Sequence, residues 1–380
     1  MATSGPCSTT GSRRCVRAPP RSQRSSPRSA NSRVHSPASP ERILLIRPSA
    51  MGDVARTVPL LAALRQAYPG ARIDWLVQDA FADVISAHPA LSRVVPFPRR
   101  EFSRWFRTGR WAALAAYLRR FSRERYDLVI DAQGLARSAL IAWCTGAPVR
   151  LGHSDARELG WIAYTARVPA DPEAHTVTRM LSLLRSLGIP AVANARTMRL
   201  YTPTSGAGFA SSVPALAGRR YAVIAPTSRW VSKQWPDERF AALARELASS
   251  GTPVALVGAA SERPQVPACT ALARENSGFV DLLGATSVAQ LMDVIEHAAL
   301  VVGNDSAALH IAVGFDRPIV GLYGPTRLHR VGPWGRPGDA IQHARASDRM
   351  DHKDARSRSL MDRISVPEVI GACRQRLAGS

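Results

Sequence analysis

Three short runs of polar and small residues hold the side chains of this sequence that are best suited to chemistry. Ser49 to Asp53 ends in a glycine and a carboxylate, Pro226 to Pro236 contains hydroxyls and a lysine, and Gly303 to His310 combines Asp, Ser and His with small residues. Each run follows a short apolar stretch, which is typical of a strand that ends in a loop before a helix. Open α/β sheets place their ligands at such strand ends.

Asp53 is the first candidate for catalysis. The apolar residues 43–46 predict a buried strand and residues 54–68 a helix, so Gly52 and Asp53 are expected where that helix begins. A carboxylate at this place could act as a general base. Asp also commonly caps a helix by accepting backbone N–H bonds. The residues alone leave both roles open.

The second and third runs contain groups that suit phosphates. Lys233 and Lys353 are the only lysines among 50 basic residues, and Lys233 stands in a loop rich in hydroxyls and backbone donors. A polar loop with a capping Ser or Thr is the alternative. In the third run, small residues open a helix whose unpaired N–H groups favour an anion. His310 could contact that ligand or simply pair with Asp305.

A metal ion or another cofactor is not expected. The sequence has no Asp-x-Asp spacing, and its histidines are not spaced as metal ligands. The five cysteines are scattered without a Cys-x-x-Cys spacing, which argues against disulfides and zinc and favours a cytoplasmic protein. Any charge on a leaving group must then be met by protein groups.

The basic charge of the chain is concentrated rather than evenly spread. The formal net charge is +21, but residues 1–40 hold seven arginines and no acidic residue, which leaves 43 basic and 29 acidic residues elsewhere. With this distribution and no recognised nucleic-acid module, nucleic acid is not expected as a partner. No apolar stretch is long enough to cross a bilayer, so membrane contact is expected to be peripheral.

Residues 99–125 are predicted to form one basic amphipathic helix. This stretch has nine arginines against two glutamates, with Trp, Phe and Leu side chains at roughly helical spacing. Such a helix could attract an anionic leaflet or an anionic acceptor sugar. The alternative is an ordinary helix that packs its aromatic side inward.

The fold class is predicted to be α/β, with two Rossmann-like domains whose parallel sheets face each other across a cleft. At 380 residues the chain exceeds what one hydrophobic core usually supports. Residues 1–41 are expected to be a disordered Arg-, Ser- and Pro-rich tail, which also fits a transit peptide or a start assigned too far upstream. Strands are expected at 43–46, 73–77, 94–95, 128–130, 221–225, 254–257, 300–302 and 319–322.

Five motifs in order resemble glycosyltransferase family 9, and in particular its heptosyltransferase I branch. They are Pro48-Ser49-Ala50-Met51-Gly52-Asp53, Ile130-Asp131-Ala132-Gln133-Gly134-Leu135, Trp235-Pro236, Asp305-Ser306-Ala307-Ala308-Leu309-His310 and Tyr323-Gly324-Pro325-Thr326. The resemblance extends from residue 42 to about residue 378. It implies a GT-B fold with an acceptor domain at 42–205, a nucleotide-sugar domain at 206–358, and a last helix in 359–380 that crosses back to the first domain.

The family implies an inverting transfer of heptose from ADP-heptose to the Kdo and lipid A inner core of lipopolysaccharide, without a metal. It places the enzyme in the cytoplasm, peripherally on the inner face of the inner membrane, with the nucleotide sugar and an anionic glycolipid as its partners. Two other readings remain. A transferase of the same fold could use another nucleotide sugar for a surface polysaccharide, or the chain could bind a nucleotide or nucleic acid without catalysis.

The resemblance also implies roles for individual residues. Asp53 would be the base and Lys233 would neutralise the leaving diphosphate. The donor would be bound by Met51, Gly52, Thr227, Ser228, Glu262, Asp305, Ser306, Ala307, Ala308 and His310. The acceptor would be bound by Ser49, Arg99, Arg100, Arg104 and Arg137. The family's usual Asp-Thr-Gly reads Asp305-Ser306-Ala307 here, which keeps a hydroxyl but adds a methyl group where the closest backbone approach is expected.

Overall fold

Each half of the chain builds a six-stranded parallel sheet. The computed structural model describes residues 39–190, 197–275 and 278–379. The first sheet has the order β3-β2-β1-β4-β5-β6, and its strands are β1 (Arg42–Ile46), β2 (Arg72–Gln78), β3 (Arg93–Phe97), β4 (Leu128–Asp131), β5 (Val149–His153) and β6 (Ala166–Val168). The second has the order β12-β11-β10-β7-β8-β9, with β7 (Ala222–Ala225), β8 (Val254–Leu256), β9 (Phe279–Asp281), β10 (Leu300–Asn304), β11 (Ile319–Leu322) and β12 (Ala340–Ile341).

The two sheets share one topology. Counted within each half, the strand order is 3-2-1-4-5-6, the Rossmann order, and every pairing is parallel. Successive strands are added toward one edge of the sheet up to β3 or β9 and toward the other edge from β4 or β10, so the order switches between β1 and β4 in the first sheet and between β7 and β10 in the second. These two switch points are where such sheets bind ligands. The predicted α/β fold with two Rossmann-like domains is confirmed.

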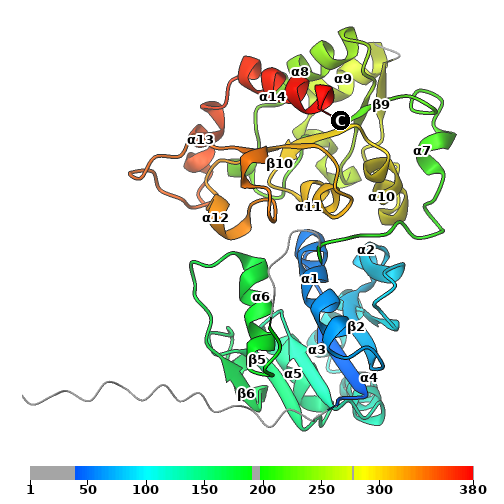
Figure 1. The fold of residues 1–380 in the computed structure, drawn as a ribbon, viewed down its shortest axis with the longest axis vertical. Coiled ribbons are helices and arrows are strands. Elements are labelled where there is room, and N and C mark those ends of the chain that lie inside the picture. Colours follow the sequence, from blue (N-terminus) through cyan, green and yellow to red (C-terminus); the bar gives the residue numbers. More distant parts are fainter. Residues whose placement is uncertain (1–38, 191–196, 276–277, 380) are drawn as a thin grey trace, which may run out of the picture. The chain divides into compact units, whose positions relative to one another are not determined.

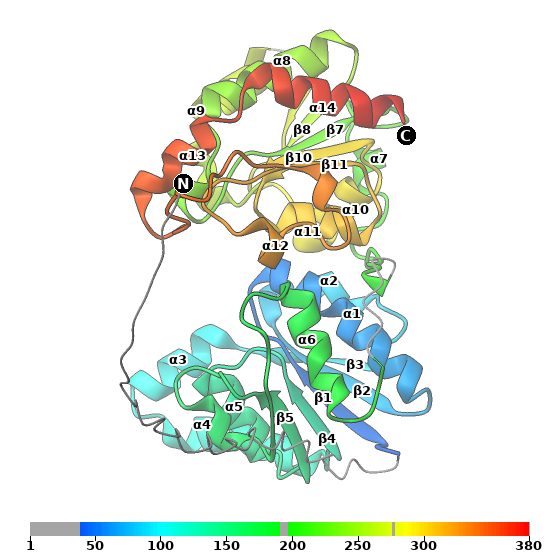
Figure 2. The ribbon, with the colours of Figure 1, turned by 60° about the vertical axis from the view of Figure 1, so that its left-hand side comes forward.

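Helices cover both faces of the first sheet (Figures 1 and 2). One face carries α1 (Met51–Ala67), α2 (Asp83–Ser86) and α6 (Thr176–Arg185), and the other carries α3 (Arg99–Arg107), α4 (Trp111–Arg123), α5 (Ala136–Cys144) and the 3-10 turn η2 (Gly160–Ala163). A 3-10 turn, η1 (Asp79–Phe81), follows β2. Because both faces are covered, the strands are nearly continuous apolar runs, and this is why several were predictable.

The second sheet is covered in the same way. One face carries α7 (Phe209–Ser212), α10 (Val288–Glu296) and α11 (Ala307–Gly314), and the other carries α8 (Asp237–Ser249), α9 (Pro267–Glu275) and α14 (Val366–Ala378). The connecting elements are η4 (Val231–Lys233), η5 (Ala260–Gln265), α12 (Leu328–Val331), η6 (Pro337–Asp339), η7 (Ala355–Arg358) and α13 (Ser359–Asp362). Buried residues on the α1 side of the first sheet and the α11 side of the second form one continuous cluster.

Helix α14 corrects one expectation. It was expected to return to the first domain, but it packs on α8 and on strands β10 and β11 of the second domain (Figure 2). Its buried Val369 and Cys373 belong to the core of the second sheet. The apolar stripe of the helix therefore completes the domain that precedes it in the sequence. None of the described helices is both long and apolar enough to cross a membrane.

The stretch 99–125 forms two helices instead of the one that was expected. Gly109 separates α3 from α4 with a φ of +66°, a left-handed conformation that glycine adopts without a steric penalty. Phe102 of α3 and Tyr117 and Phe121 of α4 are buried. Much of the aromatic side of these helices therefore packs inward. The sequence patterns also missed β5, β6, β9 and β12, most of which are short. The expected tail at 1–41 lies mainly outside the described residues.

Candidate active site

The beginnings of helices α1 and α11 meet, which brings the first and third polar runs together. Gly52 of α1 faces α11, where a Cβ on Gly52 would lie 3.0 Å from the His310 ring and 3.3 Å from the Ala307 Cα. The absent side chain therefore permits this close approach of the two helices. Two strand ends from different sheets thus build one site.

Asp53 lies in the first turn of α1 between two arginines. Its carboxylate oxygens are 2.9 Å from Arg47 Nη2 and 2.5 Å from Arg56 Nη2. The backbone N–H of Ala50 also donates to Asp53 at 3.3 Å, the weak capping contact that was the alternative role. The side chain remains about a quarter exposed. A cap and a carboxylate open to a ligand are therefore combined in one residue.

The two arginines determine the charge state of Asp53. Burial by itself would raise the pKa of the carboxyl, but the positive charges of Arg47 and Arg56 outweigh burial and hold the pKa below its usual value of 3.8. Asp53 is therefore an anion at neutral pH. A lowered pKa makes Asp53 a weak base, but at neutral pH the carboxylate is in the ionised form that can accept a proton.

Arg56 connects this carboxylate to the second domain. Its other terminal nitrogen, Nη1, donates to the carbonyl of Val331 at 3.2 Å. At the start of α6, the Thr176 hydroxyl donates to the Arg330 carbonyl at 3.0 Å, and Nε2 of the capping residue His175 lies 3.1 Å from the Gly332 carbonyl. Three side chains of the first domain thus bind three consecutive carbonyls at the end of α12.

The loop after β7 is fixed in place by a buried amide. The Asn304 Oδ1 accepts the N–H of Trp235 at 3.0 Å, and its Nδ2 donates to the carbonyl of Pro226 at 2.6 Å. Asn304 is the last residue of β10, so both ends of the loop are fastened to the neighbouring strand. The loop then places Lys233 Nζ 2.6 Å from Asp305 Oδ2.

Thr227, at the start of the loop after β7, lies next to Glu262 of η5. The Thr227 hydroxyl donates to Glu262 Oε2 at 2.8 Å, and the N–H of Ala259 donates to the same oxygen at 3.0 Å. Thr227 and Ser228 are both buried. These predicted donor-binding residues from two separate segments are therefore neighbours in the structure.

His310 is buried next to Asp305. Burial and the positive charge of Arg56 lower the pKa of His310, although Asp305, 3.8 Å away, acts in the opposite direction. Burial would raise the pKa of Asp305, but His310 and Lys233 outweigh it and lower this pKa. The Ser306 hydroxyl and His310 Nδ1 are buried without a hydrogen-bond partner. Such unpaired atoms are costly unless a ligand or water meets them.

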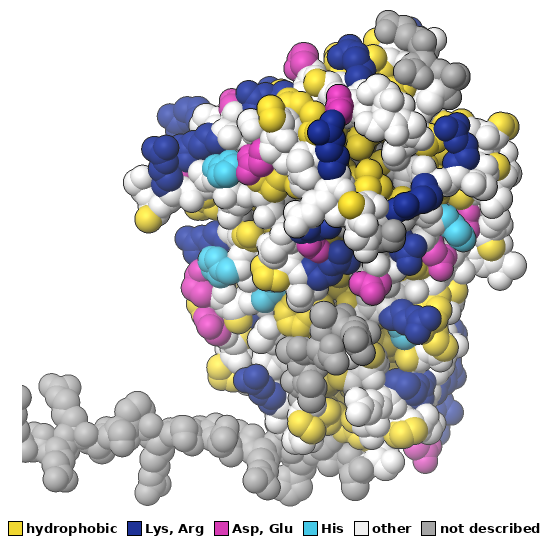
Figure 3. Space-filling view, turned by 45° about the horizontal axis from the view of Figure 1, so that its top comes forward, with side chains coloured by type: hydrophobic (Ala, Val, Ile, Leu, Met, Phe, Trp, Pro, Cys, Tyr) yellow, Lys and Arg dark blue, Asp and Glu magenta, His cyan; other side chains and the backbone are white. Residues whose placement is uncertain are grey.

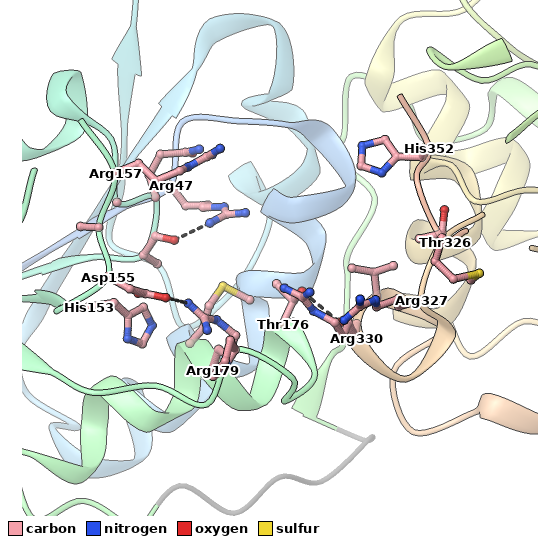
Figure 4. Close-up of a pocket in the computed structure, with 18 of the residues that line it drawn as sticks. Arg47, His153, Asp155, Arg157, Thr176, Arg179, Thr326, Arg327, Arg330 and His352 are labelled. Carbon is pink, nitrogen blue, oxygen red and sulfur yellow. Dashed lines mark hydrogen bonds and ion pairs between the residues drawn. The ribbon is translucent and has the colours of Figure 1, made fainter. Parts of the chain in front are cut away.

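A cavity of about 680 Å³ is bordered by both domains and by Arg47, the ion-pair partner of Asp53 (Figure 4). The first domain supplies the ends of β4 and β5 and part of α6, and the second supplies α12 and the loop that precedes η7. The walls are strongly basic. The arginines that line the cavity are Arg47, Arg157, Arg179, Arg327 and Arg330.

Most of the predicted acceptor residues lie outside the lining of this cavity. Arg99, Arg100 and Arg104 on α3, and Arg137 on α5, are exposed and do not line this cavity. Ser49 lies closer, because its N–H donates at 3.2 Å to the side chain of Gln133, which does line the cavity. The role of these arginines as acceptor contacts remains a prediction.

Sequence reasoning missed the arginines that surround the site. Arg47 directly follows the last residue of β1, and Arg56 stands one helical turn after Asp53, so both spacings carried a signal. Arg327 and Arg330 follow the Tyr323–Thr326 motif by one and four residues. Arg179 lies in the region around α6, for which no element was predicted.

One group of described residues has ligand atoms close enough to hold a metal ion. Asp293, Glu296 and His297 form it on α10. The carboxylate of Asp293 already accepts the N–H groups of Gly208 at 3.2 Å and Ala210 at 2.7 Å, which fastens α7 to α10. The group therefore has a structural function on a helix outside the cavity lining.

Comparisons with known proteins agree with this architecture. The profile of Glycosyltransferase family 9 (heptosyltransferase) matches residues 114–359. Lipopolysaccharide heptosyltransferase 1 of Escherichia coli K12 is 32% identical over 309 residues, which is 78% of this chain and 91% of that protein. The enzyme of the same name from Pseudomonas aeruginosa PAO1 is also 32% identical, over 78% of this chain and 82% of its own.

Solved structures give the same result. The E. coli heptosyltransferase WaaC with ADP superposes with a TM-score of 0.68 and 27% identity, covering 88% of this chain and 99% of its own. The E. coli ADP-heptose LPS heptosyltransferase II has a TM-score of 0.71 over 89% and 99% of the two chains, and at 22% identity this likeness concerns the fold alone. The fold is therefore the GT-B arrangement. The chain belongs to glycosyltransferase family 9 and is a glycosyltransferase.

Proposed function

We propose that this enzyme transfers heptose from ADP-heptose to the Kdo and lipid A inner core of lipopolysaccharide. The names of its relatives support the donor and the pathway, and one solved relative is described with ADP-2-deoxy-2-fluoro heptose. The observation that carries the proposal is that the start of α1, which holds the carboxylate Asp53, faces the start of α11, next to the ion pair of Asp305 with Lys233.

Asp53 acts as the general base in a single inverting displacement. It accepts the proton of the acceptor hydroxyl while the hydroxyl oxygen forms a bond to the anomeric carbon. The bond from that carbon to the diphosphate oxygen breaks on the opposite face, and ADP leaves with its electron pair. One carboxylate suffices, since a single nucleophile attacks and no covalent enzyme intermediate forms.

Lys233 stabilises the leaving diphosphate. In the absence of donor it is bound to Asp305 at 2.6 Å, a short charge-assisted contact. A diphosphate that enters here exchanges part of this contact for its own oxygens, and the ammonium then offsets the charge that grows as ADP departs. The beginning of α11 adds backbone donors, because the Ser306 side chain does not cap it.

The transfer is proposed to need no metal. The carboxylates of the site are already occupied by protein cations, Asp53 by Arg47 and Arg56, and Asp305 by Lys233. A hard metal ion binds through free oxygen ligands, and these carboxylates are not free. Full activity in EDTA is the expected result.

The basic cavity is proposed to receive the acceptor. Kdo carries a carboxylate and lipid A carries phosphates, and guanidinium groups bind both in a bidentate manner. Arg157 and Arg179 line the cavity on the side of the first domain, which also contains Asp53. The enzyme would work on the cytoplasmic face of the inner membrane as a peripheral protein.

A second donor is favoured by one observation. Ala307 stands where the family usually has glycine, and its Cβ lies 3.7 Å from the place that a Cβ on Gly52 would occupy. The added methyl group narrows the site between the two helices. A transferase that uses another nucleotide sugar for a surface polysaccharide is therefore the alternative.

The decisive experiment compares wild type with Asp53→Asn in the release of ADP from ADP-heptose. Release should require a Kdo-lipid A acceptor and should fall by about 10²-fold or more in the variant. The unfolding transition of each protein shows whether the variant is folded. If nucleotide is released only from another nucleotide sugar, the alternative donor is favoured. An unchanged rate in Asp53→Asn would mean that Asp53 serves as a helix cap and not as the base.

A further inference from the structure

Exposed apolar side chains are concentrated on one layer of the first domain. Among the described residues, six large apolar side chains are more than half exposed. Five of them belong to α3, α4, α5 and the segment around η2. The sixth, Val231, lies in the loop of residues 226–236 after β7, which we call the donor loop. The five are Phe106, Trp111, Trp143, Leu159 and Ile162, with exposed fractions of 57–66%.

The buried residues beneath this layer all belong to the first domain. The four elements cover the face of the first sheet opposite to α1 and α6, and they pack side by side in chain order. Phe106 and Trp111 stack edge to face, with ring centroids 5.4 Å apart, at the junction of α3 and α4. The exposure of these side chains is therefore not explained by the contact between the domains.

The same layer carries unpaired positive charge. Of the nine arginines in residues 99–125, all except Arg120 are exposed, and none of these eight forms an ion pair within the described parts of the chain. On the face in Figure 3, both basic and acidic side chains are exposed, and arginines such as Arg263 and Arg363 are paired with aspartates. We call the five apolar residues and these eight arginines the aromatic-arginine surface.

We propose that the aromatic-arginine surface docks on a bilayer that contains anionic phospholipids. Trp and Phe side chains are favourable at the headgroup level, where the ring leaves water and the lipid phosphates remain within reach of arginine. Each basic residue near an anionic leaflet strengthens binding. RNA would also attract the arginines, but it gives no role to exposed aliphatic side chains such as Leu159 and Ile162.

This docking deepens the proposed function and rests on it for its biological meaning. The proposed acceptor is a glycolipid anchored in the membrane, and the surface lies on the domain that contains Asp53 and much of the basic cavity. Docking would hold that domain at the membrane while the second domain receives the nucleotide sugar from water. The vesicle measurement itself requires no catalysis.

The test is flotation of the full chain with vesicles of phosphatidylcholine, with and without phosphatidylglycerol. The wild type should float with the anionic vesicles only, and less so at high salt. Two double variants remove separate parts of the surface, Phe106→Ser with Trp111→Ser and Arg119→Gln with Arg123→Gln. Each should weaken binding by about tenfold or more.

A matched control removes the same charge from the second domain. Arg245→Gln with Arg274→Gln changes two exposed arginines on α8 and α9 and should leave vesicle binding unchanged. Equal loss in this control, no flotation of the wild type, or binding of RNA without binding of vesicles would overturn the proposal. With a deacylated, water-soluble acceptor, both surface variants should keep the wild-type rate. An enzyme inactive on every acceptor would refute the proposed function, while flotation would still decide the docking.

Discussion

Arg56 binds Asp53 at 2.5 Å through one terminal nitrogen and the carbonyl of Val331 at 3.2 Å through the other. The proposed base is therefore oriented by a side chain that also contacts the second domain. A change at that contact alters the environment of the base directly. Arg56 is a positioning residue in this sense, because it acts on the acceptor only through Asp53.

Replacement of Arg56 by Gln should move the acidic limb of the kcat/KM profile to higher pH. The guanidinium helps to hold the pKa of Asp53 below 3.8, so its loss raises that pKa, and protonated Asp53 no longer acts as a base. A purely structural role would lower the rate equally at every pH. A pH profile of parallel shape at reduced height would therefore contradict the proposed role.

The same substitution should change the pH dependence of stability. A carboxyl whose folded pKa is depressed stabilises the native state above its unfolded pKa, and this contribution is lost as the pH falls toward the folded value. Arg56→Gln should thus reduce the free energy of unfolding by about 1–3 kcal/mol at pH 7. The difference from wild type should diminish below about pH 4. Urea unfolding at the two pH values provides the measurement.

Lys233→Ala should lower kcat/KM by about 10²–10³-fold, because the charge on the departing diphosphate loses its partner. The other lysine of the chain supplies the control, since Lys353 is exposed and lies outside the donor loop. Lys353→Ala should behave as wild type. The variants are compared in ADP release at saturating acceptor. Equal activity of Lys233→Ala and Lys353→Ala would remove the diphosphate role.

Gly52→Ala should impair catalysis, because its Cβ would lie 3.0 Å from the His310 ring and 3.3 Å from the Ala307 Cα. Either α1 or α11 must move by a few tenths of an ångström, and both hold groups of the active site. Ala307→Gly alone should retain activity but should not rescue Gly52→Ala, because the two nearest atoms, in the His310 ring and at the Ala307 Cα, remain in place. The kcat of the three variants tests this, and a fully active Gly52→Ala would show that the approach of the helices is not critical.

Arg157→Gln should raise the KM for the acceptor by about tenfold and leave the KM for the donor unchanged, since Arg157 lines the basic cavity. Arg358, an exposed arginine in η7, provides the control for loss of one positive charge. An increase in both KM values, or in the donor value alone, would place Arg157 outside the acceptor site. The acceptor role of Arg99, Arg100, Arg104 and Arg137 is tested by the same comparison.

The apolar runs at 43–46 and 319–322 determined their strands by themselves, because a strand buried on both faces of a parallel sheet needs a continuous apolar sequence. The order of five motifs likewise identified the family, and the resemblance then gave the candidates Asp53, Lys233 and Asp305. Strands such as β6 and β12 were not predictable, since two or three residues carry too weak a pattern. The break at Gly109 depends on its left-handed backbone conformation, with a φ of +66°, which glycine permits but does not require.

Tertiary structure alone decided how the two halves form one site. Nothing in the order of residues shows that Gly52 lies against Ala307, that Arg56 reaches Val331, or that α14 stays with the second sheet. The residue types and spacings determined which groups are available for chemistry, because strand ends and helix starts are local features. Their pairing depends on the approach of two separate sheets, and that approach is set by packing between residues far apart in the chain.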